Sequence, residues 1–266
     1  MQIPEHFQAA ITASIKASAA ILEIYQEDVV FDEKTDGSPV TKADFAASII
    51  IEKHLAPFGI PFTGEESEKV PFEERRQWAQ SWCVDPLDGT KEFIKKNDEF
   101  AINIALINEG KPEFGLIAAP VQQEILMGSQ EMGVYLFSFE AAANPTQWKK
   151  IEAPLTFNQP LMMACSRSHH SGPVLQMINE LKVQGHEIDF LKKGSSLKFF
   201  DLALGKADVY PRYAPTMEWD IAAGQAILEA LGGEVVHAET GQALSYNKAN
   251  LVNPYFIART KAMRKH

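Results

Sequence analysis

Apolar side chains recur every three to four positions over residues 3–29, among them Phe7, Ile11 and Leu22. This spacing predicts a long amphipathic helix packed on the body of the protein. A helix lying on a membrane surface is the alternative, but its polar face would carry little Lys or Arg. No stretch approaches the ~18 apolar residues of a membrane span, and residues 1–5 lack the basic patch of a secretion signal.

A second helix is predicted over residues 42–57, because Thr41 is a favourable N-cap and apolar residues follow at helical spacing. Its apolar positions are Phe45, Ile49, Ile50 and Leu55. Asp44 falls in the first turn, where a carboxylate compensates the helix dipole. The alternative is that Asp44 polarises a catalytic hydroxyl. Lys34, in the polar stretch upstream, is most simply a solvated loop charge.

Strand patterns dominate the rest of the first half. Strands are predicted over residues 60–64, 82–84, 100–107, 112–119, 124–127 and 133–136, with a hairpin turn at 108–111 and a loop or short helix over 68–80. Because most of these strands follow one another through short turns, they predict an antiparallel sheet. Residues 140–160 contain Asn144-Pro145, Ala153-Pro154 and Gln159-Pro160, which indicates a domain junction.

The second half alternates strands with helices. Strands are predicted over residues 161–166, 187–191, 207–211, 234–236 and 251–258, and helices over 171–184, over 197–204 and from just after Asp220 to Leu231. Such alternation is typical of a layered α/β domain. The 266 residues are therefore predicted to form an α+β domain over residues 1–145 and an α/β domain over residues 146–266.

Composition narrows the classes of function. The formal net charge of −10 argues against binding a nucleic-acid polymer, which requires a basic face. It does not exclude a small phosphorylated substrate, because bound metal ions reverse the local sign of the field. Cys83 and Cys165 are too few for a disulfide framework or a zinc cluster. A reducing, cytoplasmic compartment is therefore expected.

Two carboxylates, Asp85 and Asp88, follow a buried strand and are separated by Pro86 and Leu87. Pro and the following Gly allow a sharp bend, so both carboxylates and the Leu87 carbonyl would aim at one point. Such oxygens are the ligands of a hard cation such as Mg²⁺. Residues 89–91 would then open a helix, whose free N–H groups favour a phosphate. The alternative is an ordinary strand–turn–helix junction in which Asp88 or the next Thr is an N-cap.

Two further acids stand at the edges of predicted elements. Glu65 follows a strand that ends at Gly64, and it is a candidate third metal ligand; a solvated acidic loop is the alternative, and it suits Glu66 well. Asp220 precedes a helix, where an N-cap or first-turn acid is the default role. In that helix, Trp219 is expected in the core and Gly224 is expected to allow close helix packing.

Three blocks of sequence together resemble the inositol monophosphatase superfamily of magnesium-dependent, lithium-sensitive phosphatases. They are Gly64-Glu65-Glu66-Ser67, Asp85-Pro86-Leu87-Asp88-Gly89-Thr90 and Trp219-Asp220-Ile221-Ala222-Ala223-Gly224, in the family's order and after a Thr-Lys-Ala-Asp block. Within the superfamily, Asp88-Gly89-Thr90-Lys91-Glu92-Phe93 and Gly194-Ser195-Ser196-Leu197-Lys198 are similar to the CysQ branch. Members of that branch are 3′(2′),5′-bisphosphate nucleotidases. The resemblance covers nearly the whole chain.

The resemblance implies a five-layered α/β/α/β/α sugar-phosphatase fold that binds two or three Mg²⁺ ions. It implies metal ligation by Glu65, Asp85, the Leu87 carbonyl, Asp88 and Asp220, and orientation of the attacking water by Asp44 and Thr90. The substrate it implies is adenosine 3′,5′-bisphosphate (PAP) from sulfate assimilation, or its sulfated form PAPS, from which the 3′-phosphate is removed. An inositol or sugar phosphatase and an inactive nucleotide- or metal-binding scaffold remain the alternatives.

The substrate side is predicted less sharply. Substrate contacts are expected from Glu65, Leu87, Asp88, Gly89, Thr90, Gly194, Ser195, Ser196, Lys198, Arg212 and Asp220, with Arg167, Ser168 and His169 as further candidates. The 194–196 turn and Lys198 would hold the ribose, the adenine or the 5′-phosphate, although such residues are more often ordinary surface groups. The sequence does not predict an oligomeric state. Proteins of this branch also attach to the inner face of a bacterial membrane, which nothing in these residues indicates.

Overall fold

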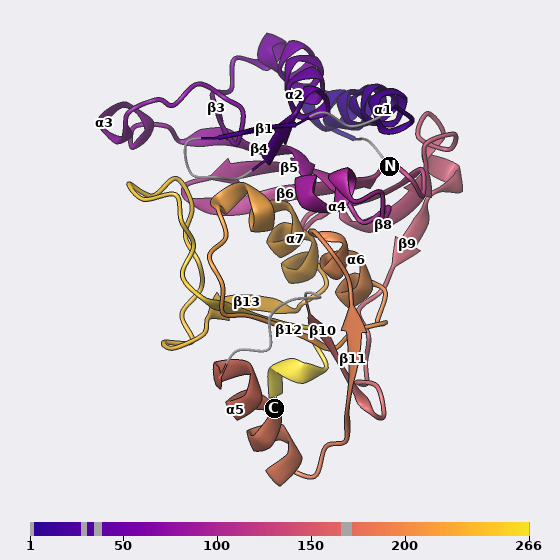
Figure 1. The fold of residues 1–266 in the computed structure, drawn as a ribbon, viewed down its shortest axis with the longest axis vertical. Coiled ribbons are helices and arrows are strands. Elements are labelled where there is room, and N and C mark those ends of the chain that lie inside the picture. The colour runs from indigo at the N-terminus through magenta and orange to yellow at the C-terminus, as the bar shows by residue number, and fades with distance from the viewer. Residues whose placement is uncertain (1–2, 28–30, 35–38, 166–171, 266) are drawn as a thin grey trace.

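The computed structural model describes residues 3–27, 31–34, 39–165 and 172–265, and these build five layers (Figure 1). The helices are α1 (Glu5–Tyr25), α2 (Lys42–Leu55), α3 (Phe72–Arg75), α4 (Thr90–Ile94), α5 (Gly172–Val183), α6 (Leu197–Ala203) and α7 (Glu218–Ala230). Short 3₁₀ turns cover Ala56–Phe58, Pro145–Gln147 and Met263–Lys265. Helices α1 and α2 cover one sheet, α6 and α7 lie between the two sheets, and α5 covers the second sheet.

The first sheet has the strand order β3-β4-β5-β6-β7-β8-β9. Its strands are Phe62–Gly64, Gln80–Asp88, Ala101–Asn108, Lys111–Ala119, Glu124–Ser129, Gly133–Ser138 and Lys149–Ile151. All neighbours are antiparallel except β3 and β4, which are parallel because the chain crosses between them through α3. The predicted meander is thus confirmed, and the all-antiparallel prediction is wrong for β3. Strand β9 comes from the predicted junction and pairs with β8, while the proposed division at residue 145 stays a prediction.

The second sheet is mixed, with the strand order β11-β10-β12-β14-β13. Its strands are β10 (Leu161–Cys165), β11 (Ile188–Lys192), β12 (Val209–Arg212), β13 (Glu234–His237) and β14 (Phe256–Arg259). Strands β1 (Phe31–Glu33) and β2 (Pro39–Thr41) form a separate antiparallel pair. The predicted strand over 251–258 is wrong in extent. Residues before Phe256 bind the segment leading into α7 instead: the Asn253 N–H donates to the Thr216 carbonyl at 2.8 Å.

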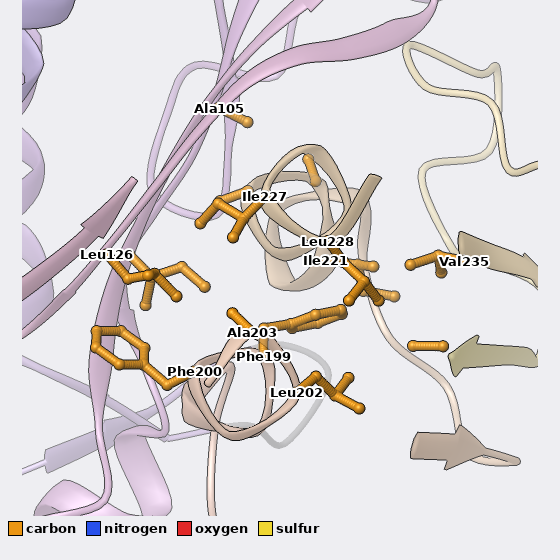
Figure 2. Packing of buried hydrophobic residues seen from close by; sticks show 14 of the residues in the cluster. Ala105, Leu126, Phe199, Phe200, Leu202, Ala203, Ile221, Ile227, Leu228 and Val235 are labelled. Atoms are coloured by element: carbon orange, nitrogen blue, oxygen red, sulfur yellow. The ribbon is translucent and has the colours of Figure 1, made fainter. Parts of the chain in front are cut away.

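The layer between the sheets is closely packed (Figure 2). A Cβ on Gly224 of α7 would lie 2.2 Å from the Phe199 ring of α6, and one on Gly115 of β6 would lie 2.1 Å from the Ala223 carbonyl. Both positions therefore exclude any side chain, and the prediction that Gly224 permits close helix packing is confirmed. Since burying each large apolar side chain contributes about 1.5–3 kcal/mol, this core holds α7 firmly against both sheets.

Helix α2 buries a face that differs in part from the one predicted. Phe45 is 50% exposed and Ile49 is 67% exposed, whereas Ala43 and Ala47 are fully buried. Helix α1 also buries small residues, among them Ala10 and Ala17, and the two helices pack on each other. This packing turns Phe45 and Ile49 outward, whereas Leu55 is fully buried as predicted.

Helix α1 ends at Tyr25, whereas the prediction extended it to residue 29. It is long and apolar enough by composition to cross a membrane, contrary to the expectation that no stretch would be. Nearly half of its apolar window is nonetheless buried inside the protein, and Phe7, Ile11 and Ile21 all lie in the core. This burial is what a core helix of a folded domain shows.

Candidate active site

Strand β4 carries the acidic turn at its end. The prediction that the strand ends at Val84 is wrong: β4 runs on to Asp88, with a break in register against β5 between Asp85 and Asp88. Pro86 explains the break, because it has no N–H to donate to the ladder. Asp85 accepts a hydrogen bond from the Leu87 N–H at 3.0 Å, which fixes the turn. Gly89 follows with φ +99°, a conformation that favours glycine.

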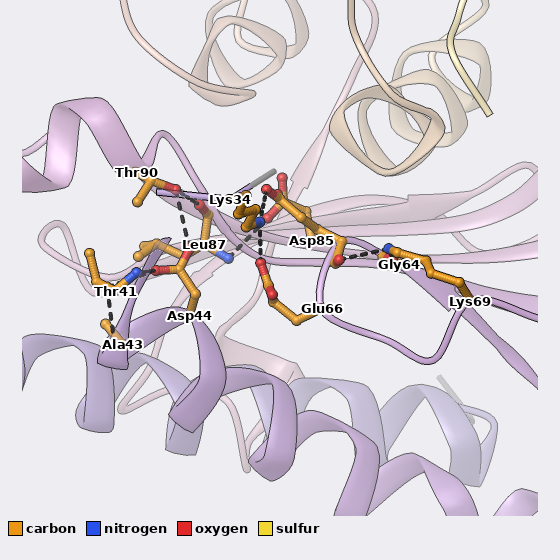
Figure 3. A network of polar contacts seen from close by, with 11 residues as sticks. Lys34, Thr41, Ala43, Asp44, Gly64, Glu66, Lys69, Asp85, Leu87 and Thr90 are labelled. Atoms are coloured by element: carbon orange, nitrogen blue, oxygen red, sulfur yellow. Dashed lines mark hydrogen bonds and ion pairs between the residues drawn. The ribbon is translucent and has the colours of Figure 1, made fainter. Parts of the chain in front are cut away.

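Asp44 and Thr90 meet although 46 positions separate them (Figure 3). The Thr90 hydroxyl lies 3.2 Å from Asp44 Oδ1 and 3.2 Å from the Leu87 carbonyl, so the Leu87 oxygen predicted to be free has a partner. The other Asp44 oxygen accepts the backbone N–H and the hydroxyl of Thr41, both at 2.7 Å. Asp44 therefore caps α2 and holds Thr90 at once, and both interpretations of its role fit.

Glu65 is bound by two lysines. The Lys34 ammonium lies 2.6 Å from Glu65 Oε1 and also contacts the Glu66 carboxylate, and Figure 3 shows this bridge. Lys69 donates to the carbonyls of Gly64 and Glu65 at 2.8 Å and stacks on the Trp219 ring. The interpretations of Lys34 as a solvated charge and of Glu66 as part of a solvated loop are therefore wrong. Sequence alone carries no signal for these contacts, because they depend on how two loops meet.

Asp220 lies in the first turn of α7 rather than before it. The helix begins at Glu218, and Asp220 Oδ2 accepts the N–H of Met217 at 2.9 Å. Glu218 is fully buried and accepts the backbone N–H groups of Asn247 and Lys248 at 2.7 and 3.0 Å. The start of α7, and with it Asp220, is thereby anchored to the loop at residues 247–248.

The acids at the ends of β3, β4 and α7 influence one another electrostatically. Burial raises the pKa of Asp220 to about 8, and burial followed by the charges of nearby acids raises the pKa of Asp85 well above its ordinary value. Burial also raises the pKa of Asp44 to about 6, and it raises the pKa of Glu65 against the opposing effect of Lys34. Buried carboxylates that repel one another are stabilised by a cation placed among them.

The donor set fits a hard cation in its chemistry, since it consists of carboxylate and carbonyl oxygens. Among the described residues, however, no three His, Cys, Asp or Glu side chains converge into a ready cation cage. The reason is visible in the contacts: Glu65 is held by an ammonium, and Asp88 accepts the Ser196 N–H. Cation binding at Glu65 would therefore displace the Lys34 ammonium, whereas Asp88 could keep the Ser196 bond on one oxygen and offer the other to the metal.

A cavity of about 480 Å³ opens beside these acids. Of the predicted substrate residues, Asp88, Gly89, Gly194, Ser195, Ser196, Lys198, Arg212 and Asp220 line it, and the described wall does not include Glu65, Leu87 or Thr90. Lys91 of α4 and Lys95, which follows the helix one turn later, also line the cavity. Neither was predicted to contact substrate. Arg167, Ser168 and His169 lie outside the described residues.

The 194–196 turn is held by Lys198. Its ammonium donates to the Ser195 carbonyl at 2.6 Å and to the Lys193 carbonyl at 3.2 Å. Burial lowers the pKa of Lys198 to about 8. By contrast, the buried Nε–H of Arg212 donates to no partner among the described groups, which leaves this donor for a ligand. Arg212 is thus the better placed of the two cations to bind substrate.

Comparison with known proteins agrees with this geometry. The model of the inositol monophosphatase family matches residues 4–264. The 3′(2′),5′-bisphosphate nucleotidase CysQ of Salmonella typhimurium is 38% identical over 250 residues, covering 90% of this chain and 94% of that protein, and the CysQ of Escherichia coli K12 is 37% identical with the same coverage.

Solved structures lead to the same family. The crystal structure of CysQ from Bacteroides thetaiotaomicron, a bacterial member of the inositol monophosphatase family, has a TM-score of 0.83 at 39% identity, covering 95% of this chain and 96% of that one. The Thermotoga maritima IMPase, with a TM-score of 0.73 at 20% identity, shares the fold over 96% of this chain and 92% of that one. The predicted resemblance and the five-layered fold are both confirmed, and the chain belongs to the inositol monophosphatase family.

Proposed function

We propose that this chain is a Mg²⁺-dependent 3′(2′),5′-bisphosphate nucleotidase that hydrolyses PAP to AMP and inorganic phosphate. The observation that carries the proposal is the Thr90 hydroxyl, held by Asp44 beside the buried acids that adjoin the cavity. The names of the relatives from Salmonella and Escherichia coli support the choice of substrate. PAPS is a second substrate consistent with the same contacts.

Glu65, Asp85, the Leu87 carbonyl, Asp88 and Asp220 would hold the magnesium ions. When bound, Mg²⁺ neutralises phosphate charge and lowers the pKa of a coordinated water. For Glu65 to serve as a ligand, the Lys34 ammonium must leave its carboxylate, since it lies 2.6 Å away. The number of ions, two or three, stays a prediction.

Thr90 would orient the attacking water. A hydroxyl has one proton to donate and two lone pairs that accept. The Thr90 hydroxyl donates its hydrogen bond to Asp44 or to the Leu87 carbonyl, so a lone pair on Oγ1 can accept a hydrogen bond from water. The water oxygen then bonds to phosphorus as the bond from phosphorus to the 3′-oxygen breaks. One proton of the water is released and the departing 3′-oxygen takes one up, so the products are the 3′-hydroxyl and hydrogen phosphate. Held in line in this way, the reactants need little further ordering.

A second phosphate on the substrate matches the charge of the cavity wall. Lys91, Lys95 and Arg212 line the cavity beside Glu92, the one acid of the described wall that is not a proposed metal ligand. One phosphate at the metal ions leaves these cations for the 5′-phosphate of a bisphosphate. An inositol monophosphate has no second phosphate to offer them, which favours the nucleotide over the sugar phosphate.

Phosphate release measured with PAP, PAPS and inositol 1-phosphate, each with and without Mg²⁺ and Li⁺, tests the proposal. We expect the highest kcat/KM with PAP, loss of release without Mg²⁺, and inhibition by Li⁺. A higher kcat/KM for inositol 1-phosphate would instead identify a sugar phosphatase. Absence of release from every substrate would identify a catalytically inactive scaffold.

We also propose a cytoplasmic location. Cys83 and Cys165 are buried free thiols, as a reducing compartment permits. The apolar face of α1 is already covered by the protein, which leaves little to insert into a membrane. Fractionation of the expressing cells tests this, and recovery of the protein in the membrane pellet at high salt would contradict it.

A further inference from the structure

Asn103 is a buried amide at the centre of an apolar strand. It lies in β5 between Ile102 and Ile104, and only 1% of its surface is exposed. A polar side chain in such a place is costly unless its hydrogen bonds are made. The proposed nucleotidase chemistry assigns it no role, so its partners show what it does.

The amide of Asn103 makes three contacts that join both halves of the chain. Its Nδ2 donates to Asp88 Oδ2 at 3.3 Å and to the Trp219 carbonyl at 3.4 Å. Its Oδ1 accepts the Ser196 hydroxyl at 2.6 Å. The Ser196 hydroxyl needs an acceptor, and the oxygens of Asp88 and Trp219 need a donor. Only the amide orientation with Oδ1 toward Ser196 and Nδ2 toward the two oxygens satisfies all three.

The same contacts fix the carboxylate of Asp88. Its Oδ2 accepts both the Ser196 backbone N–H and the Asn103 amide, whereas Oδ1 accepts no hydrogen bond from the described residues. One oxygen is thus held by the protein, and the other is left for a ligand. The contact to Trp219 places the next residue, Asp220, in the same hydrogen-bonded unit.

We propose that Asn103 is a positioning residue for the cation site. It holds Asp88 Oδ2 so that Oδ1 would be left for magnesium, and it keeps Asp88 aligned with the start of α7. This inference rests on the proposed function, since it takes Asp88 to be a metal ligand. Ser196 has a supporting role, because its hydroxyl sets the orientation of the Asn103 amide.

Mg²⁺ affinity, measured by calorimetry on the full chain without substrate, tests the proposal. Loss of such a supporting contact typically weakens metal binding about 10–100-fold. We expect this loss for Asn103→Leu, which keeps the volume of the side chain. Ser196→Ala should weaken binding less, because it keeps the backbone bond to Asp88. The double variant should bind Mg²⁺ about as weakly as Asn103→Leu alone, because the two residues act as one unit.

Gln225→Leu is the matched control. Gln225 is also an amide with 1% exposure, but it bonds Tyr246 and Glu229 away from the acids. We expect it to lower the melting temperature while Mg²⁺ affinity stays at the wild-type value. This comparison separates positioning of the metal site from a general loss of stability.

The possible results have distinct meanings. Wild-type Mg²⁺ affinity in a folded Asn103→Leu protein would overturn the proposal. If that variant does not fold, unchanged affinity in Ser196→Ala overturns it instead. A wild-type protein that binds no Mg²⁺ refutes both the positioning role and the proposed function. A wild-type protein whose Mg²⁺ affinity depends on Asn103, but which does not hydrolyse PAP, refutes the proposed function alone.

Discussion

Replacing Thr90 by Val tests the proposed nucleophile-orienting pair directly, because Val keeps the shape of Thr and removes only the hydroxyl. The two contacts of that hydroxyl are 3.2 Å long, beyond the usual 2.7–2.8 Å for O–H···O bonds. Asp44 keeps both of its bonds from Thr41. The variant should therefore lose only about 1 kcal/mol of unfolding free energy.

The expected effect on turnover is much larger. Loss of a group that positions or relays a proton typically lowers the rate about 10²–10⁴-fold, which corresponds to about 2.7–5.4 kcal/mol in the barrier. We expect this fall in kcat for PAP at saturating Mg²⁺, with KM nearly unchanged. Urea unfolding of the same samples measures the stability change separately.

Thr90→Ser is the control, because it restores the hydroxyl and should keep kcat within about tenfold of the wild type. A Thr90→Val enzyme that retains more than about a tenth of the wild-type kcat would refute the role. A loss carried by KM alone would make Thr90 a binding residue instead.

The remaining predictions concern the metal site, its pH dependence and the core. Asp88→Asn should abolish turnover with a native circular dichroism spectrum, and near-normal rates with Mg²⁺ would contradict the metal assignment. Burial raises the pKa of Asp44 to about 6 and of Asp220 to about 8, so the native state binds more protons than the unfolded state. The stability from these carboxyls is complete below pH ~4 and is lost as the pH rises through about 6 and then about 8. The melting temperature of the metal-free protein should thus fall between pH 5 and 9, and added Mg²⁺ should restore it; a rise with pH would contradict this. Gly224→Ala should cost about 1–3 kcal/mol in urea unfolding because of the 2.2 Å approach to Phe199, whereas Gly172→Ala, with nothing within 4 Å, should change little.

Local pattern determined most of the elements. The alternation over residues 100–107 and 112–119 predicts β5 and β6, and the Thr41 N-cap predicts the start of α2. These features depend on neighbours a few positions apart, which a sequence displays directly. The acidic blocks also indicated the candidate site residues, because together and in order they resemble the motifs of the inositol monophosphatase family.

Tertiary packing decided what those elements contact. Nothing local shows that Lys34 binds Glu65, or that the Asn103 amide joins Ser196 and Trp219 across 93 and 116 positions. The outward face of Phe45 and Ile49 follows from the close packing of α1 on α2. Asn103 had one visible signal, a polar residue in an apolar strand, but two of its three partners, Ser196 and Trp219, lie in the other half of the chain. Periodicity records which face of an element is buried, whereas the choice of partner depends on how whole layers stack, which no short stretch encodes.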